Sequence, residues 1–353
     1  MPDGSGRPLA DDTLRAVRWW LYGVAALVFA LIVVGGATRL TDSGLSITEW
    51  RPIVGIIPPL THADWLDALA KYREIPEYKL VNKGMSLEAF QFIFWWEWAH
   101  RFLARMVGFA FAIPFVYFAI RRRLPAGMSW KLAGLFALGG LQGAIGWYMV
   151  SSGLVERVDV SHYRLALHLT VAFLILTLLL WSAWSLLPRA ALYRGRPALP
   201  RHRRIAGVLL ALIFLQVVLG ALVAGFKAGL THNTWPLMDG QFIPDGLWVM
   251  TPWHMNIFEN ATTIQFNHRM VAYAIVALAL WQVISVVQAD DGRLAPSAFA
   301  LAGGILAQAA LGIWTLLAHV PLSLGLAHQG VAAVVTSIAA WHLFMATRPG
   351  PAV

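Results

Sequence analysis

The stretch Glu97-Trp98-Ala99-His100-Arg101 opens a strongly hydrophobic segment, and a related stretch, Gln265-Phe266-Asn267-His268-Arg269, opens another one later in the chain. Each is followed by one more histidine inside a later apolar segment, His168 in the first case and His328 in the second. Two similar halves, each with two such histidines, therefore organise the sequence.

The composition is that of an integral membrane protein. The 353 residues are 58% hydrophobic and only 13% charged, whereas a soluble domain has about a quarter of its residues charged. The net charge of +9 does not indicate nucleic-acid binding, because the basic residues cluster in short links between apolar runs. The chain has no cysteine, which excludes disulfides, thiolate metal sites and iron–sulfur clusters.

Eight segments are long and apolar enough to cross a bilayer, which takes about 20 residues. They are 19–38, 98–120, 131–151, 163–187, 205–226, 267–287, 297–318 and 321–346. Arginines gather in the N-terminal tail (Arg7, Arg15, Arg18) and in the links after the second and fourth segments. The positive-inside rule therefore predicts that both termini are cytoplasmic and that the long links 39–97 and 227–266 are on the outer side.

The two halves resemble a tandem repeat. Val33–Ala37 corresponds to Val217–Ala221, and Gln142–Gly146 corresponds to Gln308–Gly312. With four segments each, both halves cross the membrane in the same direction. We therefore predict an all-α fold of two pseudo-symmetric four-helix bundles, residues 1–190 and 191–353.

The outer link 39–97 is more patterned than a plain linker. Trp65, Leu66, Leu69 and Tyr72 lie at helical spacing among charged residues, so we expect a helix within 62–81 that lies along the membrane surface. It either caps the bundle or takes part in the chemistry, and the sequence leaves both open.

The four repeat-related histidines favour haem. His100 and His268 lie near the starts of their segments, and His168 and His328 lie one to two turns into theirs, so each pair could meet across a bundle. Zinc sites need three or four protein ligands, whereas haem needs two axial ligands and a flat apolar slot. We therefore favour haem ligation over a purely structural role.

Arginines near these histidines are candidates for the haem propionates. Arg101 and Arg269 adjoin the ligands, and Arg164 lies four residues before His168 on the same helical face. The other histidines fall in links or at segment ends, and we expect them to be solvated or locally bonded. They are His62, His162, His202, His232, His254 and His342.

The halves differ at one carboxylate. Glu97 lies three residues before His100, and the matching residue before His268 is Gln265. A carboxylate beside a haem can accept a proton or stabilise a developing cation; alternatively, Glu97 forms a salt bridge or lies among the lipid headgroups. This asymmetry suggests that the first half carries out chemistry and the second holds a resident cofactor.

Taken together, these features resemble the haem A synthase family over roughly residues 15–346. The resemblance rests on eight segments in two halves, Glu97-x-x-His100-Arg101, His168, Asn267-His268-Arg269 and Leu326-Ala327-His328-Gln329-Gly330. It implies oxidation of the C8 methyl of haem O to a formyl group, with oxygen from water, which gives haem A for terminal haem–copper oxidases. It also implies a haem b cofactor on His268 and His328, a substrate haem near His100 and His168, and a catalytic Glu97.

The absence of cysteine sets this chain apart from many members of that family, which carry a cysteine pair in the first outer link. It fits the cysteine-lacking branch found in alphaproteobacteria and mitochondria. The resemblance further implies a bacterial inner-membrane location, haem sites toward the periplasm, and cooperation with haem O synthase and oxidase assembly factors. We expect membrane lipid around the protein and no nucleic-acid partner. The sequence does not decide whether the protein forms a homo-oligomer.

Two other functions fit parts of the pattern. A dihaem b subunit that transfers electrons from a quinol would use both histidine pairs but would not explain the difference between Glu97 and Gln265. A transporter built from parallel repeats would bind no haem, and it is the weakest alternative because the histidines do not converge on the membrane midplane.

Overall fold

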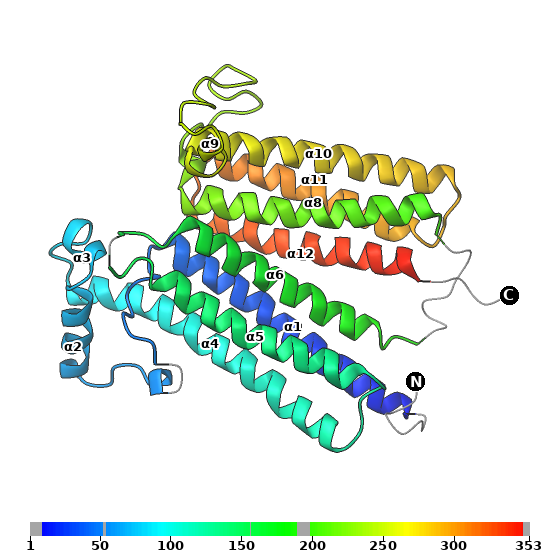
Figure 1. Cartoon of the computed structure of the whole chain (residues 1–353), viewed down its shortest axis with the longest axis horizontal. Coiled ribbons are helices and arrows are strands. Elements are labelled where there is room, and N and C mark those ends of the chain that lie inside the picture. Colours follow the sequence, from blue (N-terminus) through cyan, green and yellow to red (C-terminus); the bar gives the residue numbers. More distant parts are fainter. Residues whose placement is uncertain (1–8, 52–53, 156, 189–197, 349–353) are drawn as a thin grey trace. The chain divides into compact units, whose positions relative to one another are not determined.

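The computed structural model describes residues 9–51, 54–155, 157–188 and 198–348, and within them the protein is helical, without a β-strand. Eight helices are long and apolar enough to cross a membrane, which confirms the eight expected segments (Figure 1). They are α1 (Asp11–Leu40), α4 (Leu87–Ile120), α5 (Met128–Val150), α6 (His162–Trp184), α8 (Pro200–Gly225), α10 (Ala261–Gln288), α11 (Ala295–Leu317) and α12 (Leu322–Thr347). The short helices are η1 (Val54–Ile56), α2 (His62–Tyr72), α3 (Pro76–Leu80), η2 (Ala228–Leu230) and α9 (Met255–Glu259).

The chain divides into two compact units, Met1–Ile175 and Leu176–Val353, with the division inside α6. The boundary expected at 190/191 lies outside the described residues, as do Arg7 and the arginines of 189–197. The cytoplasmic placement of the termini and the pseudo-symmetry of the halves stay predictions.

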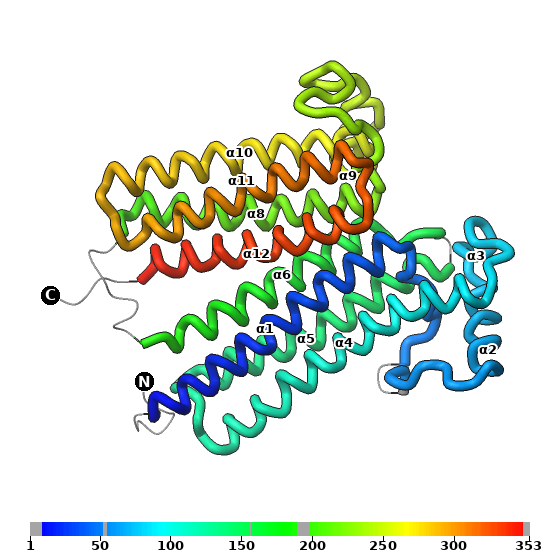
Figure 2. Tube along the Cα trace, turned by 180° about the vertical axis from the view of Figure 1, so that it is seen from behind, coloured from blue at the N-terminus to red at the C-terminus, as the bar shows by residue number. Residues whose placement is uncertain are grey.

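The second unit contains a four-helix bundle. Helix α8 packs against α10, α10 against α11, α11 against α12, and α12 against α8, so the four helices close a ring (Figure 2). Leu209, Ile275, Leu301 and Ala339 belong to the core between them, one from each helix. Apolar side chains on the inward stripe of each helix therefore build this core.

In the first unit, α1 packs along α4 and α4 packs against α5. The buried side of α1 includes Val17, Leu21, Val24 and Val28, at the three- and four-residue spacing of one helical face. Helix α6 joins α5 through Gln142, whose side-chain amide donates to the carbonyl of His168 at 2.8 Å.

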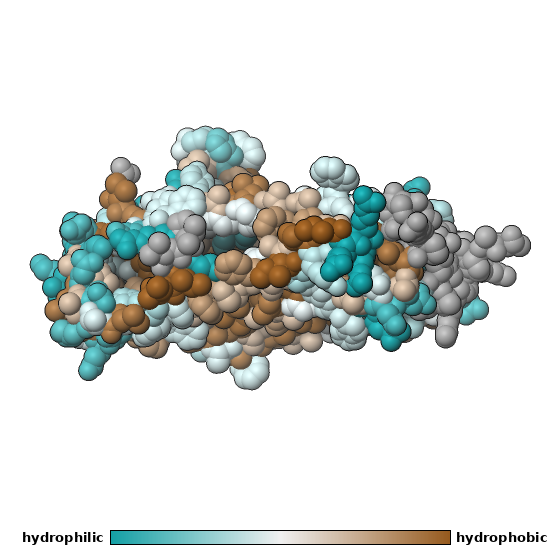
Figure 3. Space-filling model, turned by 90° about the horizontal axis from the view of Figure 1, so that it is seen from below, coloured by the Kyte–Doolittle hydropathy of each residue, from teal (hydrophilic) through white to brown (hydrophobic). Residues whose placement is uncertain are grey.

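The surface of the long helices suits a lipid environment. On the face seen in Figure 3, hydrophobic side chains cover the middle stretches of these helices, and hydrophilic side chains gather toward the helix ends. Large apolar side chains such as Phe109 and Ile113 of α4 and Ile284 of α10 are exposed. In water such exposure would be unfavourable, whereas a bilayer accommodates it.

The helix expected within 62–81 is present as α2 and α3. Thr61 and Asp64 form a capping box at the start of α2. Pro76 begins α3 after a break at 73–75, because proline lacks the N–H that a continuous helix needs there. Leu69 and Tyr72 of α2 are buried in a cluster that α4 also enters, so this element caps the unit.

The helix that contains the second expected membrane segment begins before residue 98. Helix α4 begins at Leu87, where the Ser86 hydroxyl accepts from the Ala89 N–H at 3.2 Å. Its first three turns are helical because Phe90 and Phe94 are buried against α2. Glu97 and His100 therefore lie well inside a helix instead of opening one.

Candidate functional site

Each unit brings its two expected histidines together. His100 on α4 and His168 on α6 are close enough to interact electrostatically. His268 on α10 and His328 on α12 interact in the same way in the second unit. All four side chains are only half-buried, although they lie inside long apolar helices. Two imidazoles therefore share a region in each unit.

In the first unit, a glycine on the neighbouring helix lies against each imidazole. A Cβ added to Gly35 of α1 would lie 2.9 Å from Cε1 of His100, and one added to Gly146 of α5 would lie 3.0 Å from Cε1 of His168. Both distances are at or below the limit of real Cβ contacts. Any larger residue would displace the ring, so glycine is what lets each imidazole lie directly on the adjacent backbone.

The second unit repeats this arrangement. A Cβ added to Gly220 of α8 would lie 3.2 Å from Cε1 of His268, and one added to Gly312 of α11 would lie 2.8 Å from Cε1 of His328. In each unit the histidines therefore come from the second and fourth long helices and the glycines from the first and third.

Three of the four glycines belong to a Gln-x-x-x-Gly pattern, and its glutamine holds the histidine backbone. The glutamine side-chain amide donates to the histidine carbonyl in Gln142–His168 at 2.8 Å, Gln216–His268 at 3.0 Å and Gln308–His328 at 3.0 Å. In α1, Leu31 takes the glutamine position before Gly35. The repeats contain this pattern, but its role was not predicted from the sequence.

The histidine nitrogens are suited to metal ligation. The Nδ1 atoms of His168 and His268 are buried and have no hydrogen-bond partner among the described residues. Nδ1 of His328 lies 3.2 Å from the amide nitrogen of Gln308. A buried polar atom without a partner is costly, and coordination to iron would relieve that cost for a ring nitrogen. The residues present fit a haem with two axial imidazoles in each unit.

The described residues do not support a metal site built from protein side chains alone. Among them, no group of three histidine, aspartate or glutamate side chains is placed to hold a metal ion. Structural zinc takes four ligands and catalytic zinc takes three.

Glu97 is buried, only 3% exposed, and bonded through both carboxylate oxygens. Oε1 accepts from Arg101 Nη2 at 2.6 Å and from Nε at 3.0 Å. Oε2 accepts from the Ser46 hydroxyl and from the Ile47 N–H, each at 2.8 Å. The salt bridge to Arg101 left open by the sequence is therefore present, and the carboxylate is held in one orientation.

Arg101 also holds the loop that follows α1. Its Nη1 donates to the carbonyl of Glu49 at 3.0 Å and its Nη2 to that of Ile47 at 2.8 Å. The guanidinium thus joins α4 to the segment that follows α1, which the sequence did not predict because its partners are backbone atoms.

Arg269 makes the corresponding contacts in the second unit. Its Nη1 donates to the carbonyl of Thr234 and its Nη2 to that of His232, each at 2.9 Å. Gln265 donates to the same His232 carbonyl at 3.1 Å. Nε of Arg269 is buried without a partner among the residues described, so one donor is left for another group.

Arg164 joins α6 to the end of α5. Its Nη1 donates to the carbonyl of Tyr148 at 2.6 Å and to the Ser151 hydroxyl at 3.3 Å. The guanidinium carbon lies 3.7 Å from the centre of the Tyr148 ring, a cation–π contact. The second unit has Leu324 at the same spacing before His328.

The expectation of solvated or locally bonded histidines is wrong for His202 and His342, which are 0% exposed. His342 lies 2.9 Å from the Gln282 amide nitrogen and 2.8 Å from the Ser297 hydroxyl. His202 lies 3.2 Å from the Ser285 hydroxyl. These side chains form a polar cluster inside the second bundle, and its long-range contacts left no local pattern in the sequence.

The chain is similar to known proteins over almost its whole length. A family model described as cytochrome oxidase assembly protein, COX15-CtaA, matches residues 18–340. A protein of Brucella anthropi named heme A synthase is 52% identical over 340 residues, which is 96% of this chain and 94% of the relative. A heme A synthase of Parvibaculum lavamentivorans is 52% identical over 334 residues, 94% of this chain and 95% of the relative. One of Brucella ovis is 51% identical over 340 residues, again 96% and 94%.

Proposed function

The chain belongs to the COX15-CtaA family of cytochrome oxidase assembly proteins, and from that premise we propose that it is a membrane oxidoreductase that converts haem O to haem A. The observation that carries the proposal is identity above one half, over almost the whole chain, with relatives named heme A synthase. The product serves the assembly of cytochrome oxidase.

The reaction oxidises one methyl group of the substrate. A methyl carbon and one water give a formyl group, four protons and four electrons. The first two-electron step forms the alcohol, and the second forms a gem-diol that loses water to the aldehyde. The protein must therefore bind the substrate haem, stabilise positive charge at the reacting carbon and remove protons.

The two units divide this work. His100 and His168 hold the substrate haem, and His268 and His328 hold a resident haem b, which supplies one-electron redox chemistry when bound. The glutamine contacts support this division: both histidine carbonyls of the second unit are held by glutamine, whereas in the first unit only that of His168 is. A resident cofactor stays bound, so it benefits when both of its ligands are held in place. A substrate haem must be released after the reaction, which a less firmly held ligand allows.

Glu97 acts in the first unit as a fixed negative charge. It lies one helical turn from His100, and its four hydrogen bonds hold it in place. A preorganised charge stabilises a cationic transition state without reorganising during the reaction. Gln265, which is neutral, cannot do this in the second unit.

The propionates of the two haems need cations. The unpartnered Nε of Arg269 supports a propionate contact in the second unit. Arg101 and Arg164 are the candidates in the first unit, where their contacts with the outer loop and with Tyr148 hold them beside the histidines. We place the protein in a bacterial inner membrane, with its haem sites toward the periplasm, receiving substrate from a haem O synthase.

Haem extraction tests the function. The full-length protein is purified from cells that also make haem O, and its extracted haems are separated by chromatography. Haem b together with haem A, or with haem O and haem A, is the expected result. Haem b alone, with the supplied haem O unchanged, would overturn the proposal and favour a dihaem electron carrier.

A further inference from the structure

Glu77 is a buried acid that the proposed reaction does not use. It lies on α3, in the outer loop of the first unit, and is 4% exposed. The Tyr72 hydroxyl donates to its Oε2 at 3.1 Å, and the Asn82 amide donates to the Tyr72 oxygen at 2.7 Å. Burial raises the pKa of Glu77 to about 7, although the Tyr72 hydrogen bond lowers it. This carboxyl can therefore gain and lose a proton near neutral pH.

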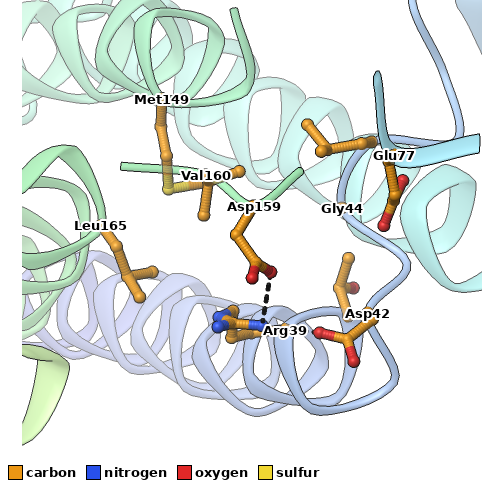
Figure 4. A pocket seen from close by; sticks show the side chains of 10 residues that line it. Arg39, Asp42, Gly44, Glu77, Met149, Asp159, Val160 and Leu165 are labelled. Carbon is orange, nitrogen blue, oxygen red and sulfur yellow. Dashed lines mark hydrogen bonds and ion pairs between the residues drawn. The ribbon is translucent and has the colours of Figure 1, made fainter. Parts of the chain in front are cut away.

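Glu77 lines a cavity at the outer end of α1 (Figure 4). The figure shows the Asp159 carboxylate turned toward Arg39, whose guanidinium also pairs with Asp42 at 2.8 Å, and Glu77 apart from these three side chains. The cavity measures about 50 Å³, which is room for more than one ordered water. Its lining contains three carboxyl groups and one guanidinium, that of Arg39, which pairs with Asp42 and Asp159. Glu77 is therefore the carboxyl group of this lining that Arg39 does not neutralise.

The cavity lies about one helical turn from the expected substrate site. Thr38, in its wall, is three residues along α1 from Gly35, the glycine that touches His100. Leu165, also in its wall, is three residues before His168 on α6. Three residues are close to one turn of an α-helix.

Thr38, in the cavity wall, lies close to the surroundings of Glu97. Its hydroxyl is 3.0 Å from the carbonyl of Val34 in its own helix and 3.3 Å from the carbonyl of Trp96, next to Glu97. The charge of Glu97 acts on both Glu77 and Tyr72. The charged and titratable groups around Glu77 come from the elements packed against it. They are Tyr72, Asp42, Asp159, Glu97 and, in the same cavity, Arg39.

We propose that Glu77 and the cavity beside it form the route by which protons released during oxidation of the substrate methyl leave the first unit. This rests on the proposed function, which releases four protons and four electrons for each formyl group. The Glu77 carboxylate takes a proton from a water on the Glu97 side and, as the neutral acid, returns it to water in the cavity. The four electrons are taken up separately by an external one-electron acceptor.

The test uses the full-length, haem-loaded protein and three variants. Haem A formation from supplied haem O is measured across a pH series in wild type, Glu77→Gln and, as matched control, Glu74→Gln, whose side chain is exposed in the same loop. Wild type and control should show a rate that rises through pH 7, since Glu77 accepts protons only as the carboxylate. Glu77→Gln should lose this transition and at least about a hundredfold in rate, the low end of what a proton-transferring group contributes.

Two further readouts separate a proton route from a structural role. Infrared difference spectra should contain a protonated-carboxyl band that titrates near pH 7 in wild type and Glu74→Gln and is missing in Glu77→Gln. Tyr72→Phe removes the hydrogen bond that lowers the Glu77 pKa, so it should move the rate transition to higher pH. If Glu77→Gln does not fold, Tyr72→Phe still tests the proposal.

The outcomes are distinct. A wild-type rate and pH profile in Glu77→Gln, or an unmoved transition in Tyr72→Phe, would overturn the proton route while leaving the proposed function intact. A wild-type protein that makes no haem A would overturn the proposed function and the route with it.

Discussion

The Arg101 guanidinium lies 2.6 Å from Oε1 of Glu97, which is buried, whereas Arg101 itself is 18% exposed. Through the same guanidinium, Arg101 holds the carbonyls of Ile47 and Glu49. The residue that carries the expected reaction charge is therefore also part of the contact that fixes the loop over the site.

Removing Arg101 should destabilise the protein more than removing Arg269. Each variant loses two hydrogen bonds from a charged guanidinium to loop carbonyls, about 1.5 kcal/mol each. Arg101→Ala in addition leaves the Glu97 charge buried and unpaired, which costs about 3 kcal/mol. Thermal unfolding of both variants measures the difference.

The double variant Glu97→Gln/Arg101→Ala provides the control. It contains no unpaired buried charge, so its stability should rise from that of Arg101→Ala to the level of Arg269→Ala. If the double variant were no more stable than Arg101→Ala, the loop contacts alone would account for the loss.

The glycine behind His328 should be essential for the resident cofactor. In Gly312→Ala the new Cβ would lie 2.8 Å from Cε1 of His328, so the imidazole must move and haem b affinity should fall at least about tenfold, equal to 1.4 kcal/mol. Gly303→Ala on the same helix meets nothing within 4 Å and should keep haem b. The absorbance of purified protein gives the haem content, and full occupancy in Gly312→Ala would contradict the assignment.

The corresponding pair in the first unit should affect the substrate haem. Gly146→Ala places a Cβ 3.0 Å from Cε1 of His168, whereas Gly143→Ala, one turn earlier on α5, meets nothing within 4 Å. Chromatography of extracted haems should show less haem O and haem A in Gly146→Ala, with haem b unchanged. Equal losses of haem b in this variant would argue against separate sites.

Glu77 should make stability depend on pH. Its folded-state pKa of about 7 lies above its ordinary value of 4.5, so the folded protein binds the proton more tightly than the unfolded chain does. Stability is therefore lost as the pH rises from about 4.5 to about 7 and does not change further above that.

Glu77→Gln removes this dependence. As the pH rises, the free energy of unfolding of Glu77→Gln should increase relative to that of wild type, by at most about 3 kcal/mol above pH 7. Unfolding midpoints measured across this range check it, with Glu74→Gln as a control that should follow wild type. A constant offset between Glu77→Gln and wild type would show that Glu77 does not titrate in this window.

The membrane segments could be predicted because the bilayer restricts what may cross it. Length and apolar composition locate all eight helices. The start of α4 could not be predicted, because its first turns depend on Phe90 and Phe94 packing under α2. The sequence periodicity of 87–97 does not reveal that contact.

The candidate site could be predicted only in part. Repetition identified the four histidines, since each recurs at a matching place. It did not reveal what Arg101 and Arg269 bind, because their partners are loop carbonyls that any residue type provides. The burial of His202 and His342 likewise depends on partners from distant helices.

The central claim is that the first unit carries out the oxidation and that Glu97 supplies the charge for it. The most direct measurement is the haem composition of purified Glu97→Gln, made in cells that produce haem O, beside wild type. The substitution keeps the size of the side chain and leaves all four histidines in place. We predict that Glu97→Gln contains haem b and haem O but no haem A; haem A at the wild-type level would contradict the claim.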